Sequence, residues 1–174
     1  EMEGDRPGAD VWLGFDGLTL NEIKGTGQWR PLDVSGIKWM DFSIKLSQLT
    51  EAFVPFDWAP LTFVYREGEI TPPRSIEDLL SSRYRRQIAM MDPRTSLPGA
   101  VFLNWVAETK SSYSGGRNRL EADVRDFFVV FNPNVLSYSP GWSQAYGLFK
   151  RGQAKLAWTY LSSPVYHWRE EKDL

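Results

Sequence analysis

From residue 68 onward, segments with the pattern of helices alternate with short apolar segments that have the pattern of buried strands. Helices are expected at 75–85, 98–110, 121–131, 143–151 and from 164 onward, and strands at 87–91, 135–138 and 155–160. This alternation predicts an α/β fold in which helices cover a largely parallel sheet. In such sheets, ligands bind beyond the carboxyl ends of the strands. The candidate binding loops are therefore residues 92–98, 138–143 and 160–164.

The first third of the chain has weaker patterns. Residues 9–15 are predicted as a strand, and residues 18–24 as a helix. Residues 53–66 are rich in β-branched and aromatic side chains but contain Pro55 and Pro60, and proline is excluded from the central strands of a sheet. We therefore predict three parts: a partial first lobe (1–54), a segment that crosses between two lobes (55–67) and a second α/β lobe (68–174).

The composition excludes several classes of function. Hydrophobic residues make up 42% of the chain, which is enough for a core, but no apolar run approaches the length of a membrane span. A net charge of −2 argues against binding to the phosphate backbone of nucleic acids. The absence of cysteine excludes disulfides and thiolate sites, and a single histidine, His167, disfavours a zinc site or a Ser-His-Asp triad.

Enzyme signatures are also missing from the sequence. It has no G-x-S-x-G, P-loop or H-E-x-x-H motif, and its aspartates form no carboxylate pair that the sequence can place together. We therefore expect no catalytic residue, cofactor or metal site, so a binding protein is favoured over an α/β enzyme. A fragment that binds a partner protein and no small ligand is the remaining alternative.

Residues 141–167, GWSQAYGLFKRGQAKLAWTYLSSPVYH, hold most of the candidate binding side chains. Ser143 and Ser163 are each expected to cap a helix, so that two helix N-termini flank the end of a strand. For Ser163, a structural cap and a ligand contact both stay open. Trp142 lies in a turn and not in an apolar periodic pattern, which favours a stacking surface. Tyr166 lies one turn beyond Ser163 and is expected to face the same cleft.

The loop DPRTSLPG, residues 92–99, has a second set of polar groups at a helix N-terminus. Thr95 and Ser96 lie there beside free backbone N–H groups, which suit a phosphate or a carboxylate. Simple capping of the helix explains the same residues equally well. The loop alone does not decide between the two.

Four motifs in order and spacing resemble the periplasmic thiamine-binding proteins: VPFDW-x4-FVY, PPRSIEDLL, DPRTSLPG and the segment 141–167. The opening EMEGDRPGADVWLGFD is also similar to a strand and turn of that family's first lobe. These proteins are the solute receptors of thiamine ABC importers and have the two-lobed type II periplasmic-binding-protein fold. The resemblance implies one near-complete lobe plus part of the other. We expect the chain to be a piece of a longer receptor.

The resemblance also implies a set of ligand contacts. They fall on Ser96, Leu97, Trp142, Tyr160, Leu161, Ser162, Ser163 and Tyr166. Leu97 stands where the family has a hydroxyl residue. The family's opening strand and helix, with an acidic ligand contact, have no counterpart here, and neither does its C-terminal return with a further stacking tryptophan. Asp16 is the only local substitute that we can suggest for the acidic contact.

The implied function is capture of thiamine or its phosphates for an ABC transporter permease, in the periplasm or outside the cell. Thiamine has two flat rings, one of them cationic, which suit aromatic faces. Its phosphorylated forms suit hydroxyls and helix N-termini. A receptor for another solute, such as ferric ion or a polyamine, is the alternative within the class, since Tyr160 and Tyr166 could also serve a ferric site.

Overall fold

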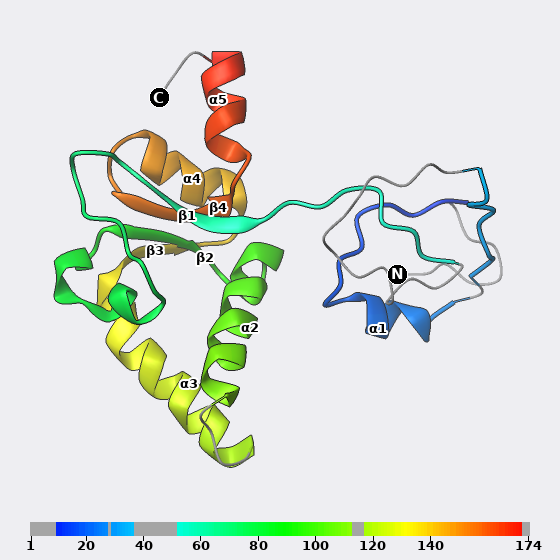
Figure 1. Ribbon diagram of the computed structural model, residues 1–174, viewed down its shortest axis with the longest axis horizontal. Helices are drawn as coiled ribbons and strands as arrows, with labels where there is room; N and C mark the ends of the chain where they lie inside the picture. The colour runs from blue at the N-terminus through cyan, green and yellow to red at the C-terminus, as the bar shows by residue number, and fades with distance from the viewer. Residues whose placement is uncertain (1–9, 28, 37–51, 113–116, 172–174) are drawn as a thin grey trace. The chain divides into compact units, whose positions relative to one another are not determined.

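The computed structural model describes residues 10–27, 29–36, 52–112 and 117–171. The chain forms two compact units, Glu1–Trp58 and Ala59–Leu174 (Figure 1). The second unit contains the four-stranded sheet. The described part of the first unit contains one short helix, α1 (Leu20–Lys24), which confirms the helix predicted at 18–24.

The sheet of the second unit has four strands in the order β1-β4-β2-β3. Strand β2 runs parallel to both β3 and β4, whereas β1 runs antiparallel to β4 at the edge of the sheet. The largely parallel sheet is thus confirmed. The carboxyl ends of β2, β3 and β4 lie side by side, and this row of strand ends is called the carboxyl edge of the sheet. The strands are β1 (Leu61–Tyr65), β2 (Ile88–Met91), β3 (Val135–Ser139) and β4 (Leu156–Tyr160).

Helices cover both faces of this sheet, as the alternating pattern predicts. Figure 1 shows α2 and α3 on one face and α4 on the other. The α-helices of this unit are α2 (Leu97–Ser111), α3 (Arg117–Phe131), α4 (Trp142–Lys150) and α5 (Ser163–Glu171). Three short 3-10 helices are η2 (Glu77–Leu80), η3 (Ser82–Tyr84) and η4 (Asn132–Asn134).

The two faces of the sheet have different side chains because β4 alternates large and small residues. Leu156 and Trp158 belong to the main core, together with Phe102 from α2 and Phe131 from α3. Ala157, between them, belongs to a smaller cluster that packs against α4. Complete burial of each large side chain contributes about 1.5–3 kcal/mol. The small residue on the other face lets α4 lie close to the strands.

Residues 10–15, most of the predicted strand 9–15, form no strand, so this prediction is wrong; residue 9 lies outside the described residues. A strand is held by hydrogen bonds to a neighbouring strand. No described segment of the first unit pairs with residues 10–15, and Val11 and Leu13 are 71% and 69% exposed. The aromatic residues nearby pack together instead, with the rings of Trp12 and Phe15 centred 4.7 Å apart.

The helix predicted at 75–85 is replaced by η2 and η3, and its interruption has a tertiary cause. The buried side-chain amide of Asn134 donates hydrogen bonds to the carbonyl oxygens of Leu79 (2.8 Å) and Ser81 (3.0 Å). Ser81 is extended, with ψ at 134°. Ile76 is the N-cap of η2, and the hydroxyl of the preceding Ser75 accepts a 3.2 Å hydrogen bond from the Asp78 N–H.

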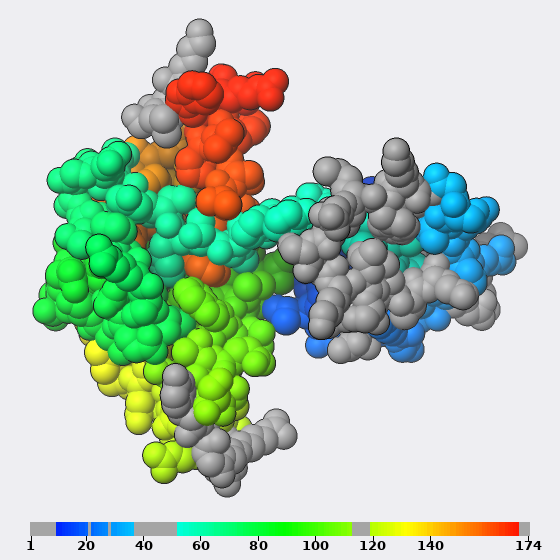
Figure 2. Space-filling view, in the orientation of Figure 1, coloured from blue at the N-terminus to red at the C-terminus, as the bar shows by residue number. Residues whose placement is uncertain are grey.

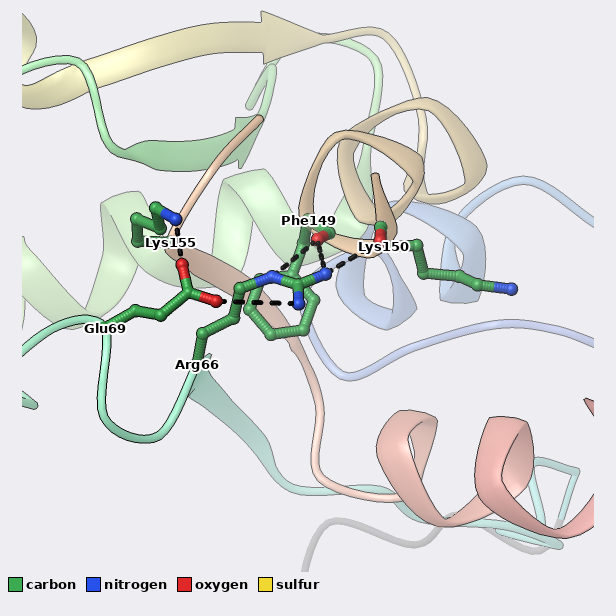
Figure 3. A network of polar contacts seen from close by, with 5 residues as sticks. All are labelled: Arg66, Glu69, Phe149, Lys150 and Lys155. Atoms are coloured by element: carbon green, nitrogen blue, oxygen red, sulfur yellow. Dashed lines mark hydrogen bonds and ion pairs between the residues drawn. The ribbon is translucent and has the colours of Figure 1, made fainter. Parts of the chain in front are cut away.

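The proline-containing segment 53–66 begins in the first unit and ends in the second. The ring of Phe53 lies 5.1 Å from that of Trp29. At the other end, the guanidinium of Arg66 lies over the ring of Phe149, 5.3 Å from its centroid (Figure 3). The assignment of residues 1–54, 55–67 and 68–174 to lobes and a crossing segment stays a prediction.

Candidate functional site

The three predicted binding loops follow the carboxyl ends of β2, β3 and β4, and hydrogen bonds join the first loop to the second and to β4. The Asp92 N–H donates to the Ser139 carbonyl at 2.8 Å, and the Thr95 hydroxyl donates to the Pro140 carbonyl at 2.9 Å. The indole N–H of Trp158 donates to the Pro98 carbonyl at 2.7 Å. The loops after β2 and β3 are thus held in one arrangement with β4.

The start of α2 lies directly against the end of β2. A Cβ atom on Gly99 would lie 2.5 Å from the Met91 carbonyl oxygen, so only glycine permits this approach. Ser96 precedes the helix, but its side chain makes no capping hydrogen bond. The Ser96 hydroxyl therefore does not cap α2 in this structure. Ser96 and Leu97 are both half-buried at this edge of the sheet.

Trp142 is the first residue of α4, and Gly141 is the N-cap, so the prediction that Ser143 caps this helix is wrong. The extended Gly141, with φ at −154°, brings the chain into the helix two residues earlier than a Ser143 cap would. The half-buried Trp142 indole donates its N–H to the Thr159 hydroxyl at 2.8 Å. Trp142 is therefore held against the end of β4.

The predicted capping role of Ser163 is also wrong, because Ser163 is the first residue of α5 and not the residue before it, and its buried side chain has another partner. The Ser163 hydroxyl lies 3.0 Å from the Thr159 hydroxyl, on the side of α5 that faces β4. Thr159 was not singled out in the sequence, because it lies within an apolar strand. A single polar side chain in the segment LAWTY is the signal that could have found it.

The aromatic surroundings of Trp142 fix its ring further. Tyr146 stacks on it with centroids 5.3 Å apart and an angle of 12° between the rings. The ring of His167 is also nearly parallel to it, at 6.1 Å and 15°. Part of the Trp142 surface is thus used for packing, and the predicted stacking role concerns the part that remains open.

The other predicted contacts lie around the end of β4 and on α5. Tyr160 is the last residue of β4 and is half-buried, whereas Leu161 is 55% exposed and Tyr166 is 58% exposed. Exposed side chains of α5 stand at the surface of the second unit (Figure 2). The carbonyl of Ser162 accepts the Tyr166 N–H at 2.9 Å, which sets the first turn of α5.

Asp16 belongs to the first unit and has a local structural role. Its Oδ1 atom accepts hydrogen bonds from the backbone N–H groups of Leu18 (2.7 Å) and Thr19 (3.0 Å), just before α1. A carboxylate that accepts two backbone hydrogen bonds in a turn is well satisfied. A ligand contact by Asp16 stays a prediction.

At the carboxyl edge of the sheet, the charge of Asp92 is balanced by that of Arg94. Arg94 forms an ion pair with Asp92, with 2.6 Å between Nη2 and Oδ2. Hydrogen bonds from Arg94 lower the pKa of Asp92 to about 2. Burial, and then the charge of Asp92, raise the pKa of Tyr138 to about 12. At neutral pH Asp92 is therefore ionised and Tyr138 is protonated.

No group of three or more histidine, aspartate or glutamate residues in the described part of the chain could hold a metal ion. None of the helices in the described part of the chain combines the length and the apolar character needed to cross a bilayer.

An α/β unit whose carboxyl-edge loops hold stacked aromatic residues and hydroxyls is typical of proteins that bind small solutes. The chain belongs to the family of bacterial extracellular solute-binding proteins, since the sequence profile of that family matches residues 31–173.

The similar proteins of known name include thiamine-binding periplasmic proteins. That of Brucella abortus is 31% identical over 99% of this chain and 48% of its own length. That of Escherichia coli is 32% identical over 98% of this chain and 49% of its own length. The chain therefore spans about half the length of these relatives.

Solved structures agree on the fold. A periplasmic thiamin binding protein, 28% identical, has a TM-score of 0.69 over 89% of this chain and 45% of that protein. A spermidine/putrescine ABC transporter substrate-binding protein from Streptococcus pneumoniae has a TM-score of 0.64 at 19% identity, over 88% of this chain and 48% of that protein, which supports the fold alone. The predicted type II periplasmic-binding-protein fold class is confirmed.

Proposed function

We propose that this chain is part of a receptor that captures thiamine or a thiamine phosphate for an ABC importer. The observation that carries the proposal is the similarity to thiamine-binding periplasmic proteins, which extends over 98–99% of the chain and so includes all three loops at the carboxyl edge of the sheet. The receptor acts in the periplasm or outside the cell, delivers its ligand to a transporter permease and has no catalytic activity.

The ligand in this proposal lies against Trp142, with Tyr160 and Tyr166 completing an aromatic surface. The thiazolium ring of thiamine is a permanent cation, and cations bind to the faces of tryptophan and tyrosine rings. The polar end of the ligand lies near the start of α2 and the start of α5. The remaining proposed contacts are Ser96, Leu97, Leu161, Ser162 and Ser163.

The orientation of Trp142 supports this arrangement. Its indole N–H is already paired with Thr159, and its ring packs on Tyr146. A tryptophan held in place before the ligand arrives loses little conformational entropy on binding. Its half-buried position leaves part of the ring open to a ligand.

Calorimetric titration of the chain tests the proposal. Thiamine and thiamine monophosphate are the probes, and spermidine and ferric citrate test the alternative solutes. We expect thiamine to bind, and Trp142→Ala to raise the dissociation constant about five- to thirtyfold, the scale of a cation–π contact. Trp168→Ala is the matched control, because Trp168 is 60% exposed on α5 and lies outside the proposed contacts. Binding of spermidine or ferric ion in place of thiamine would contradict the proposal.

A further inference from the structure

The hydrogen bond between Trp142 and Thr159 has a defined direction. An indole N–H can only donate, so the Thr159 hydroxyl oxygen must accept at this 2.8 Å contact. The hydroxyl proton of Thr159 is then free to donate to the Ser163 hydroxyl, 3.0 Å away. Thr159 is completely buried, and Ser163 is 5% exposed. A short chain of buried polar groups therefore runs from α4 through β4 to α5.

Packing alone does not explain a hydroxyl at position 159. The preceding residues of β4, Leu156, Ala157 and Trp158, are apolar and buried, and valine would fill the volume of threonine in such a strand. Burial of a hydroxyl is unfavourable unless the hydroxyl forms hydrogen bonds. What threonine adds over valine is therefore the connection between the Trp142 indole and the start of α5.

We propose that Thr159 is a positioning residue for the ligand-stacking face of Trp142, and that Ser163 holds the Thr159 hydroxyl in the orientation that accepts the indole N–H. This inference rests on the proposed function. Tyr146 and His167 restrict the tilt of the Trp142 ring, whereas Thr159 fixes its rotation within that plane. Without the hydroxyl, the ring must be ordered when the ligand binds, which weakens binding.

The test compares Thr159→Val, which keeps the shape and removes the hydroxyl, with Thr159→Ser, which keeps the hydroxyl. We expect Thr159→Val to raise the dissociation constant for thiamine about two- to tenfold, the effect of ordering one side chain, and Thr159→Ser to bind nearly as the unsubstituted chain does. The indole N–H of Trp142, assigned by its loss in Trp142→Phe, should exchange with solvent faster in Thr159→Val without any ligand. Ser163→Ala should also speed this exchange, and the exchange measured without ligand carries the test if Thr159→Val does not fold, because Ser163 is itself a proposed ligand contact.

A double-mutant cycle separates positioning from other effects. In a Trp142→Ala background, Thr159→Val should not lower thiamine affinity further. Suppose that thiamine binds the unsubstituted chain. The inference is then overturned if Thr159→Val leaves the thiamine affinity unchanged, or if it lowers the affinity equally in the Trp142→Ala background. In both cases the proposed function stands. If the unsubstituted chain does not bind thiamine, the proposed function itself fails.

Discussion

The guanidinium of Arg66, just beyond β1, donates hydrogen bonds to the Phe149 carbonyl at the end of α4, at 3.3 Å from Nε and 2.8 Å from Nη2. It also donates to the Lys150 carbonyl at 2.7 Å (Figure 3). The last carbonyl groups of a helix lack partners within the helix, and they carry partial negative charge. The Arg66 guanidinium thus supplies hydrogen-bond partners for the last carbonyl groups of α4, the helix that begins with Trp142. Glu69 forms ion pairs with both Arg66 and Lys155, the residue directly before β4.

Removal of this guanidinium is predicted to destabilise the second unit. Arg66→Ala should lower the free energy of unfolding by about 1.5–3 kcal/mol, the scale of hydrogen bonds to a charged group. Arg66→Lys should recover only part of this, because one ammonium group cannot reproduce the planar fork of the guanidinium. Urea unfolding followed by circular dichroism measures both. The control is Arg85→Ala, which removes an exposed arginine, and an equal loss in Arg66→Ala and Arg85→Ala would contradict this account of Arg66.

The contact between Gly99 and β2 gives a second prediction. A methyl group at position 99 would lie 2.5 Å from the Met91 carbonyl oxygen and 2.8 Å from the Asp92 carbonyl carbon. These are backbone atoms at the end of β2 and not the ends of flexible side chains, so α2 must move outward. Gly99→Ala should therefore lower the free energy of unfolding by about 1–3 kcal/mol, although alanine is the better helix former. A Cβ atom on Gly17 would contact nothing within 4 Å, so Gly17→Ala is the control. Unchanged stability in Gly99→Ala would show that this approach is not as close as described.

The alkaline titration of Tyr138 gives a third prediction. Burial, followed by the charge of Asp92, raises its pKa from 10.0 to about 12, and its hydroxyl donates to the Asn132 Oδ1 atom at 2.7 Å. Because the folded state holds this proton more tightly than the unfolded state, its stabilisation is complete below about pH 10 and is lost as the pH rises towards about 12. Tyrosinate absorbance should show a late-titrating component that decreases in Tyr138→Phe; the pKa of the buried Tyr84 is also raised, so part of the component stays. A Tyr138 that titrates near its ordinary value would contradict this description.

The parts of the fold that depend on local pattern were predictable from the sequence. Strands β2, β3 and β4 follow apolar runs, and Gly152, with φ at +70°, ends α4 where glycine is expected. The parts that depend on distant partners were not. Asn134 interrupts the helix predicted at 75–85 by binding carbonyl groups more than fifty residues earlier in the chain.

The candidate site likewise contains features that could be predicted from the sequence and features that could not. The loops and Trp142 could be identified from turn chemistry and from the family motifs. The roles of two serines could not, because helix capping is a local rule and the competing partners are tertiary. Ser163 pairs with Thr159 on the adjacent strand, and Gly141 enters the helix before Ser143. Thr159 itself gains its role only from Trp142, seventeen residues earlier.

The length of the chain relative to its relatives leads to a fourth prediction. It covers 49% of the thiamine-binding periplasmic protein of Escherichia coli, and two-lobed receptors enclose their ligand by closing around it. A site that is open on one side stays solvated, which weakens its electrostatic contacts with a cation. We therefore predict that this chain binds thiamine more weakly than the full-length Escherichia coli protein does. Parallel fluorescence titrations compare the two, and equal affinities would mean that the binding cleft is complete within these 174 residues.

The central claim is that thiamine binds at the carboxyl edge of the sheet, against Trp142. Its most direct test is a thiamine titration of the nitrogen-15-labelled chain, with the indole N–H signals of all eight tryptophans followed separately. The account predicts a saturable shift of the Trp142 signal, with the signal of the exposed Trp168 unchanged. A titration in which Trp142 does not respond, or in which only tryptophans away from this edge respond, would contradict it.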